Sequence, residues 1–184
     1  MKTRLLVPVI FAFVVLMPIL TACNSGTTER DFNFIFKYGI TAKNELDTFK
    51  NTYTRDMILD PSVTIRLKLT DEELDTILQK MKEINFFDYP DEFSIELAPD
   101  SLIGLVTPYA SYYFKAEYEG VVKELRWDDE IIWQDERLGD SKDKIFIENK
   151  DEAEKLYQLV TLIREIIENR PEYEKLPEPT GGYL

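Results

Sequence analysis

The chain has 184 residues, with 35 acidic and 22 basic side chains, a formal net charge of −13, one cysteine and no histidine. The lack of histidine excludes Ser-His-Asp and Cys-His catalysis and the imidazole ligands of most zinc sites. The acidic balance argues against nucleic acid as a partner, because phosphate binding needs a basic surface. The single cysteine excludes a disulfide within the chain.

The first twenty residues have the organisation of a secretory leader. Lys2 and Arg4 precede an apolar run from residue 5 to residue 20. This run is near the upper length of a signal-peptide core and near the lower limit of a membrane-spanning helix. Pro8 and Pro18 would each remove a backbone donor from a spanning helix, and no basic cluster follows the run. The pattern therefore favours a signal peptide; an uncleaved single span is the alternative.

The leader ends in Leu20-Thr21-Ala22-Cys23, which resembles the lipobox of bacterial lipoproteins. The resemblance implies that residues 1–22 are a lipoprotein signal peptide, that Cys23 receives a diacylglyceryl group, and that cleavage precedes Cys23. Residues 23–31 would then be a lipidated tether, reaching on the order of 15 Å as a random coil. Two or three acyl chains hold a protein at a membrane far more firmly than one. We therefore expect the cell membrane, extracytoplasmic face, as the location. The alternative is a secretory peptide followed by an incidental cysteine.

Two stretches after the tether alternate between apolar and polar residues, as a half-buried strand does. The first runs from Phe32 to Tyr38, before Gly39, and the second is residues 63–69. The mixed segment 40–60 between them is predicted to be a long connection with weak helical tendency, interrupted at Asp60-Pro61.

A helix is predicted to follow Thr70, because Thr70 and Glu73 have the spacing of a capping box. Its apolar residues recur at helical spacing and form one stripe: Leu74, Ile77, Leu78, Met81 and Ile84. Four aromatic residues follow: Phe86, Phe87, Tyr89 and Phe93. They could form a ligand platform, but packing beneath the helix end is the favoured interpretation. Residues 94–110 are predicted to be loop, with a short edge strand at residues 95–97.

A hairpin is predicted around a two-residue turn at Glu119-Gly120. That turn places Tyr118 opposite Val121, Phe114 opposite Leu125, Tyr112 opposite Trp127 and Lys115 opposite Glu124. Aromatic–aliphatic pairs then share one face and an opposite-charge pair lies on the other, which is the arrangement that cross-strand energetics favour.

A second helix is predicted after residue 149, with Asn149 and Glu152 at its start and Asn169-Arg170-Pro171 at its end. Its stripe consists of Ala153, Leu156, Val160, Ile163 and Ile167. A short strand at residues 145–147 would precede it. Residues 171–184 are predicted to be an extended or disordered tail unless Tyr173, Leu176 and Tyr183 dock on the domain.

These elements predict an α+β domain over residues 32–170. It would consist of an antiparallel sheet of about four or five strands, with two amphipathic helices packed on one face. The run from Phe34 to Phe93, and the ending with Pro-Glu-Tyr, Leu-Pro and Gly-Gly-Tyr, resemble uncharacterised lipoproteins of Bacillus-type bacteria. That family has no assigned activity, so the resemblance implies no site.

The segment 128–143 is strongly acidic and supplies the hard oxygen ligands that calcium prefers. The candidate ligands are Asp128, Asp129, Glu130, Asp135, Glu136, Asp140 and Asp143. Their spacing departs from the EF-hand pattern, and a solvated acidic loop is the favoured interpretation. Trp133 lies among these acids. It is a candidate partner contact if exposed, or an anchor of its loop to the core.

The sequence carries no catalytic motif, glycine-rich phosphate loop or cofactor signature. We expect a non-catalytic domain that binds another envelope protein or a small ligand through the loops opposite the helices, with no cofactor. The alternatives are an envelope hydrolase that uses paired carboxylates and a weak calcium-binding module.

Overall fold

The computed structural model describes residues 31–101, 105, 107–130 and 145–183. Six strands form one antiparallel sheet in the order β4-β3-β2-β1-β5-β6. The strands are β1 (Phe32–Tyr38), β2 (Asn44–Asp47), β3 (Thr52–Met57), β4 (Asp60–Arg66), β5 (Ser111–Tyr118) and β6 (Val121–Asp128). The helices are α1 (Asp71–Glu83), α2 (Lys150–Glu168) and α3 (Pro171–Glu174), and a 3-10 turn, η1 (Phe86–Asp88), follows α1.

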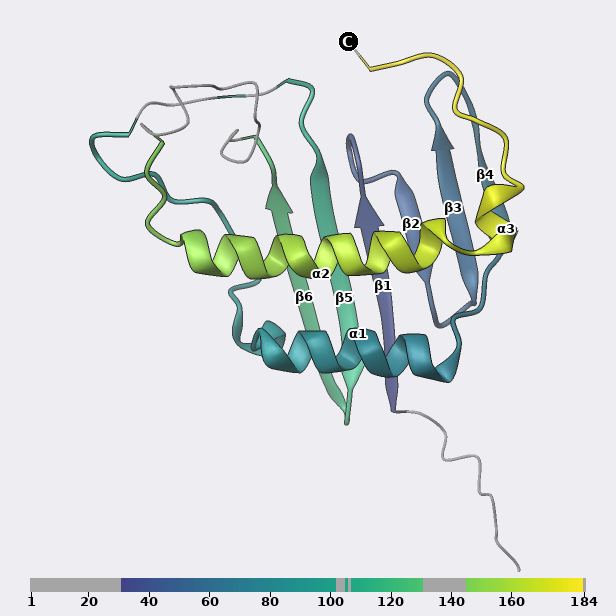
Figure 1. Ribbon diagram of the computed structural model, residues 1–184, viewed down its shortest axis with the longest axis horizontal. Coiled ribbons are helices and arrows are strands. Elements are labelled where there is room, and N and C mark those ends of the chain that lie inside the picture. The colour runs from purple at the N-terminus through teal and green to yellow at the C-terminus, as the bar shows by residue number, and fades with distance from the viewer. Residues whose placement is uncertain (1–30, 102–104, 106, 131–144, 184) are drawn as a thin grey trace, which may run out of the picture.

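Helices α1 and α2 lie across the same face of the sheet (Figure 1). The predicted α+β class with an antiparallel sheet is confirmed. The predicted element count is too low, because the described residues contain six strands and a third, short helix.

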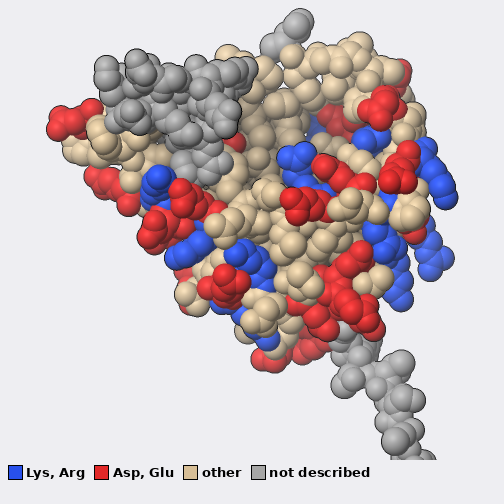
Figure 2. Space-filling model, in the orientation of Figure 1, with Lys and Arg blue, Asp and Glu red and all other residues tan. Residues whose placement is uncertain are grey.

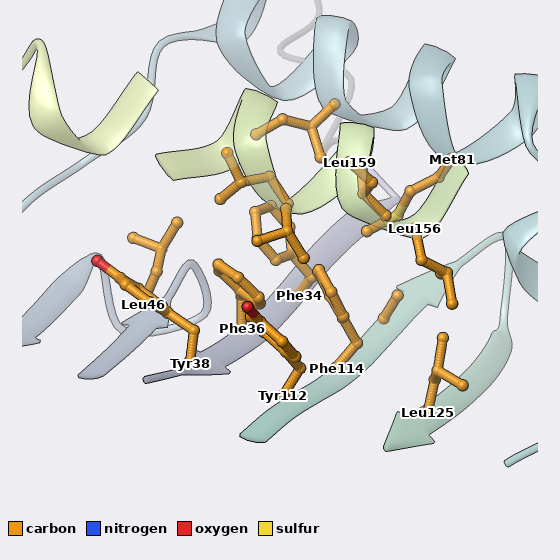
Figure 3. Close-up of a cluster of buried hydrophobic side chains, with 14 of the residues drawn as sticks. Phe34, Phe36, Tyr38, Leu46, Met81, Tyr112, Phe114, Leu125, Leu156 and Leu159 are labelled. Atoms are coloured by element: carbon orange, nitrogen blue, oxygen red, sulfur yellow. The ribbon is translucent and has the colours of Figure 1, made fainter. Parts of the chain in front are cut away.

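The core lies between the two long helices and an aromatic sheet face (Figure 3). Alternate residues of β1 point to this face, and Phe32, Phe34, Phe36 and Tyr38 are all buried. The Phe36 ring stacks on Phe114 of β5, with the ring centroids 4.5 Å apart. The helices complete the core with the predicted stripes, including Ile77 and Met81 of α1 and the five predicted residues of α2, all of them buried. The alternation in β1 and the helical spacing in α1 and α2 therefore bury complementary faces.

The β5–β6 hairpin has the predicted register at every pair. Glu119 and Gly120 both have positive φ, at 50° and 77°. This backbone is the primed turn whose twist matches that of the strands. Tyr112 stacks on Trp127 with the ring centroids 4.7 Å apart, so the predicted aromatic pair is in contact.

The prediction of a long connection over residues 40–60 is wrong, because the segment contains β2, β3 and the start of β4. Both strands are short, and their turns use positive φ at non-glycine residues such as Thr41 and Asn51, so the sequence lacks the usual glycine signals. The predicted break at Asp60-Pro61 lies inside β4. Proline is tolerated there because β4 is an edge strand.

The strand predicted at residues 63–69 is shifted toward the N-terminus. Strand β4 ends at Arg66, and Leu67 and Leu69 lie beyond it, buried in the core. The capping box that follows is confirmed, since the Thr70 hydroxyl accepts from the Glu73 backbone and the Glu73 carboxylate accepts from the Thr70 backbone.

The predicted aromatic packing after α1 is also confirmed. Phe86, Tyr89 and Phe93 are buried, and Phe87 packs against the core. Phe86 lies edge-on to the Phe114 ring, with the centroids 5.4 Å apart. These residues close the core below the end of α1.

Asn149 is the N-cap of α2 but makes no side-chain capping bond. Its amide instead binds the 94–96 loop, accepting from the Glu96 backbone N–H at 3.0 Å and donating to the Ser94 carbonyl at 2.7 Å. The strands predicted at residues 95–97 and 145–147 reduce to a single bridge between Leu97 and Ile147.

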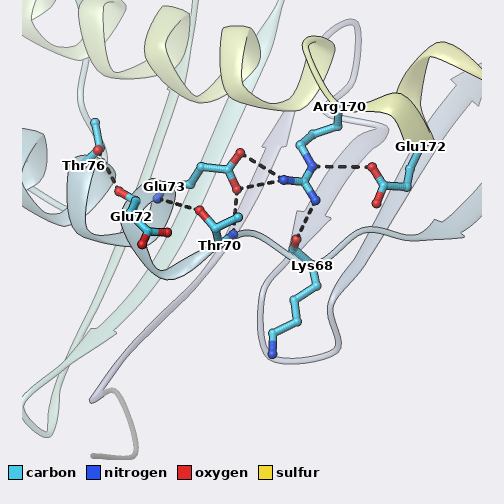
Figure 4. A network of polar contacts seen from close by, with 7 residues as sticks. All are labelled: Lys68, Thr70, Glu72, Glu73, Thr76, Arg170 and Glu172. Atoms are coloured by element: carbon cyan, nitrogen blue, oxygen red, sulfur yellow. Dashed lines mark hydrogen bonds and ion pairs between the residues drawn. The ribbon is translucent and has the colours of Figure 1, made fainter.

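Arg170 joins the start of α1 to the end of α2 (Figure 4). Its guanidinium contacts the Glu73 carboxylate at 3.2 Å, the Lys68 carbonyl at 3.2 Å and Glu172 at 3.5 Å. Glu73 thus serves both the capping box and this ion pair. Because the Arg170 side chain is only 20% exposed, its donors depend on these partners rather than on water.

The C-terminal segment docks on the domain through Tyr173, Leu176 and Tyr183, the three residues predicted to decide whether it is ordered. Tyr173 of α3 packs against Tyr53, with the ring centroids 5.5 Å apart. Leu176 is buried, and the Tyr183 hydroxyl binds Asp56. The segment also contains α3, which a purely extended tail would lack.

Replacing Arg170 by methionine should lower the free energy of unfolding by about 2 kcal/mol, because charged hydrogen bonds to partly buried partners are lost. Urea unfolding measures this, with Lys155→Met on the exposed face of α2 as the control expected to stay within about 0.5 kcal/mol. In a double-mutant cycle, Arg170→Met and Glu73→Gln should be non-additive by about 1 kcal/mol. Strict additivity would show that the pair does not couple the helices.

Candidate functional site

A cavity of about 360 Å³ lies where the ends of β1 and β3 meet the end of α2 and the C-terminal segment. We call it the tyrosine pocket. Its volume is within the range of small-ligand sites. Its ionisable and aromatic lining residues are Tyr38, Tyr53, Tyr173, Tyr183, Arg55, Arg164, Asp56, Glu168 and Glu178.

Strand alternation and one bulge bring together the pocket residues that β1 and β3 contribute. Tyr38 is the last residue of β1, and Tyr53 lies on the same sheet face because both strands pair with β2 in that register. The ladder between β3 and β4 shifts between Arg55 and Met57. Such a bulge interrupts alternation, and Arg55, Asp56 and Met57 are consecutive buried residues. A cation and an anion therefore sit at the edge of the core.

The hydroxyl groups of Tyr38 and Tyr53 are 2.7 Å apart. Burial raises the pKa of Tyr38 to about 12. Burial raises the pKa of Tyr53 further above its ordinary value, and the neighbouring Tyr38 adds to the shift. Both phenols are therefore neutral near pH 7, where they can donate and accept hydrogen bonds but supply no phenolate.

Three cations lie over tyrosine rings around the pocket. The Arg55 guanidinium is 4.4 Å from the Tyr173 centroid, Arg164 is 5.6 Å from Tyr38, and the Lys43 amine is 5.7 Å from Tyr183. The first of these is a close cation–π contact. Arg55 is only 8% exposed. A planar, delocalised guanidinium tolerates such burial better than an ammonium group does.

Two pocket carboxylates are engaged by neighbouring donors. Asp56 accepts from the Ile58 backbone N–H at 3.1 Å and from the Tyr183 hydroxyl. Glu168 accepts from Arg164 at 3.0 Å. Burial raises the pKa of Tyr183 to about 12, with Asp56 contributing as its acceptor. The pocket thus offers aromatic surface and hydrogen-bonding groups, an arrangement suited to holding a ligand.

A second depression, of about 380 Å³, lies over the buried rings of Tyr89 and Phe93. We call it the acidic groove, since its rim includes Asp88, Glu92, Glu96 and Glu152. All four acids are solvent-exposed, and Glu92 contacts Arg126 at 3.6 Å. Perturbed, desolvated groups mark functional sites more strongly than hydrated ones do, so the tyrosine pocket is the stronger candidate.

Only part of the predicted cation site falls in the described residues. Asp128 and Glu130 are exposed, whereas Asp129 accepts a hydrogen bond from Tyr157 and has a pKa raised by burial. The described residues contain no group of three acidic or thiol ligands able to hold a metal ion. Asp135, Glu136, Asp140, Asp143 and the candidate contact Trp133 lie outside the described residues, as do Cys23 and the leader. The calcium and lipidation assignments stay predictions.

Sequence reasoning missed the residues that line the tyrosine pocket. Tyr53, Arg55 and Asp56 fall in the segment predicted to be a connection, and the pocket lies on the helix-covered side of the sheet rather than in the loops opposite the helices. The β-forming residues Thr52, Tyr53 and Thr54 are the signal that could have revealed β3. No local sequence pattern indicates that Tyr183 binds Asp56, which lies 127 residues earlier in the chain.

No protein-family model matches the chain, and no curated protein is similar to it at a significant level. In the part of the chain that the structure describes, no helix is both long enough and apolar enough to cross a membrane.

The raised phenol pKa of Tyr38 predicts a loss of stability in alkaline solution. Below pH 10 this phenol is protonated in both states; above pH 10 the unfolded chain releases its proton while the folded chain retains it up to about 12. The free energy of unfolding should therefore fall through this window. Between pH 9 and pH 11, the free energy of unfolding of Tyr38→Phe should fall by about 1 kcal/mol less than that of the wild type.

Urea unfolding across that pH range makes the comparison, and absorbance at 295 nm follows phenolate formation in the folded protein. Parallel stability curves for wild type and Tyr38→Phe would show that this phenol ionises normally.

Proposed function

We propose that the chain is a lipid-anchored extracytoplasmic binding protein that holds a ligand in the tyrosine pocket without transforming it. The observation that carries the binding function is the pocket itself, in which buried, neutral tyrosine hydroxyls meet arginine and carboxylate groups. The lipobox-like Leu20-Thr21-Ala22-Cys23 carries the anchor.

The placement of the pocket supports an anchored binding role. Residue 31 precedes β1 at one end of the sheet, and Tyr38 ends β1 at the opposite end (Figure 1). Seven residues of strand span about 20 Å. A domain tethered through its N-terminus would therefore present the pocket away from the bilayer, toward envelope components.

The surface charge is consistent with a protein that stays clear of anionic headgroups. Acidic and basic side chains are interspersed over the face that carries α1 and α2 (Figure 2). The formal net charge of −13 is repelled by an anionic membrane. Acyl chains would supply the attachment that the folded surface lacks.

The acidic groove is the place where a carboxylate-based hydrolase would be sought. A glycosidase acid is a carboxyl group removed from water so that it keeps its proton. The carboxylates of the acidic groove are solvent-exposed. This difference favours binding over hydrolysis.

Cys23→Ala should abolish lipid labelling, because no thiol remains to accept the diacylglyceryl group. In cells fed a labelled fatty acid, the wild type should carry the label in the membrane fraction. The variant should be unlabelled and either released or retained as an unprocessed precursor. A variant that stays tightly bound and labelled would contradict the lipid anchor.

A photo-crosslinking amino acid at position 168, at the end of α2 in the pocket wall, should capture the ligand in living cells. Position 174, exposed on α3 and outside the pocket lining, is the matched control. Mass spectrometry should find an adduct at position 168 that is absent at position 174. Equal labelling at both positions, or none at position 168, would refute ligand binding in the pocket.

A further inference from the structure

The last residues of the chain lie along one side of the tyrosine pocket and pair with the turn between β3 and β4. We call residues 176–183 the strap. The Thr180 N–H donates to the Met57 carbonyl at 3.1 Å, and the Leu59 N–H donates to the Thr180 carbonyl at 3.3 Å. Ile58 and Thr180 form a parallel β-bridge. Main-chain hydrogen bonds of this kind also hold extended peptides on protein surfaces.

Side chains of β3 and β4 bind the strap at three further points. Arg55 donates to the carbonyl oxygens of Leu176 at 3.4 Å and of Pro177 at 3.0 Å. Asp60 accepts from the Thr180 hydroxyl at 2.8 Å, and Asp56 accepts from the Tyr183 hydroxyl. These two strands therefore contact three parts of the strap: a backbone segment, a threonine, and a tyrosine three residues after it.

The strap itself is mostly exposed. Leu176 is buried and Tyr183 is half-buried, whereas residues 177–182 between them are exposed. Two prolines and two glycines in this stretch give it no helix or hairpin of its own. Beyond Leu176, the position of the strap therefore depends on a few polar contacts, which water or another peptide can replace segment by segment.

We infer that the groove formed by the end of β3 and the tyrosine pocket is a peptide-binding site, and that the strap is an intramolecular occupant. The exchangeable ligand is an extended segment of a partner protein containing Thr-x-x-Tyr, the spacing of Thr180 and Tyr183. This inference rests on the proposed binding function and names the ligand class. A strap tethered to its own groove has an effective concentration in the millimolar range, so it competes with any free segment.

A synthetic peptide of residues 176–184, Leu-Pro-Glu-Pro-Thr-Gly-Gly-Tyr-Leu, tests the inference on the full chain in detergent. The strap-weakened variant is Thr180→Ala with Tyr183→Phe, which leaves the groove residues outside the strap unchanged. Fluorescence anisotropy of the labelled peptide should show at least about tenfold tighter binding to this variant than to the wild type, because the competitor in cis is weaker. Thr161→Ala with Tyr109→Phe, both exposed and outside the strap, should bind as the wild type does.

A control peptide with alanine for its threonine and phenylalanine for its tyrosine should bind the strap-weakened variant at least about tenfold more weakly than the native peptide. Tyr183→Phe alone, which removes one hydroxyl, provides an intermediate step if the double variant unfolds. Equal peptide affinity for the wild type and the variants, equal affinity of the two peptides, or strap exchange into a dimer in place of peptide binding would each overturn the inference.

The two proposals fail separately. An adduct at position 168 in cells without peptide binding in solution would leave the pocket a ligand site and remove the peptide class. Peptide binding in solution without an adduct would support the groove and count against the cellular binding role.

Discussion

The structure depends on covering one aromatic face of a sheet. Phe32, Phe34, Phe36 and Tyr38 all project from β1 to the same side, and each is at most 7% exposed. Burying a side chain of this size contributes about 1.5–3 kcal/mol relative to exposure. Without histidine ligands or a disulfide, this packing is the main available source of stability. The apolar stripes of α1 and α2 pack on this face, because an apolar helix stripe and an apolar sheet face bury each other.

The tyrosine pocket is the place where the aromatic ladder of β1 ends. Tyr38 stacks on Phe36 at 5.0 Å and directs its hydroxyl to Tyr53. A phenol has an apolar body and a polar tip, so it can belong to the core and still supply a hydrogen-bonding group. The same burial that stabilises the sheet keeps both phenols protonated. Core packing and pocket chemistry thus have one physical cause.

Two arginines integrate the C-terminal segment in different ways. Arg170 bonds to Glu73 and to the Lys68 carbonyl, which holds the end of α2 against the start of α1. Arg55 bonds to two strap carbonyls instead of to a second helix. The first junction lies between helices that are packed in the core, whereas the second holds an exposed segment. This difference is why the strap, rather than α3, is the exchangeable element.

The periodic elements could be read from the sequence, because their signals are local. Alternation in residues 32–38, the Thr70–Glu73 capping box, the turn at Glu119-Gly120 and the helical stripe after Asn149 each involve neighbours a few residues apart. The hairpin register follows from the turn alone, since side chains alternate with a period of two. The antiparallel α+β class follows from these elements in turn.

The strand β3 and the pocket could not be read in this way. Arg55 is an inward-facing cation, which the hydrophobic pattern assigns to the surface, and it is tolerated only because Tyr173 and two strap carbonyls meet it. Asp56 and Tyr183 are 127 positions apart. The sequence by itself determined the two long helices, the hairpin and the aromatic face. The tertiary structure alone decided the pocket, because buried polar groups are satisfied by partners that only the fold brings within reach.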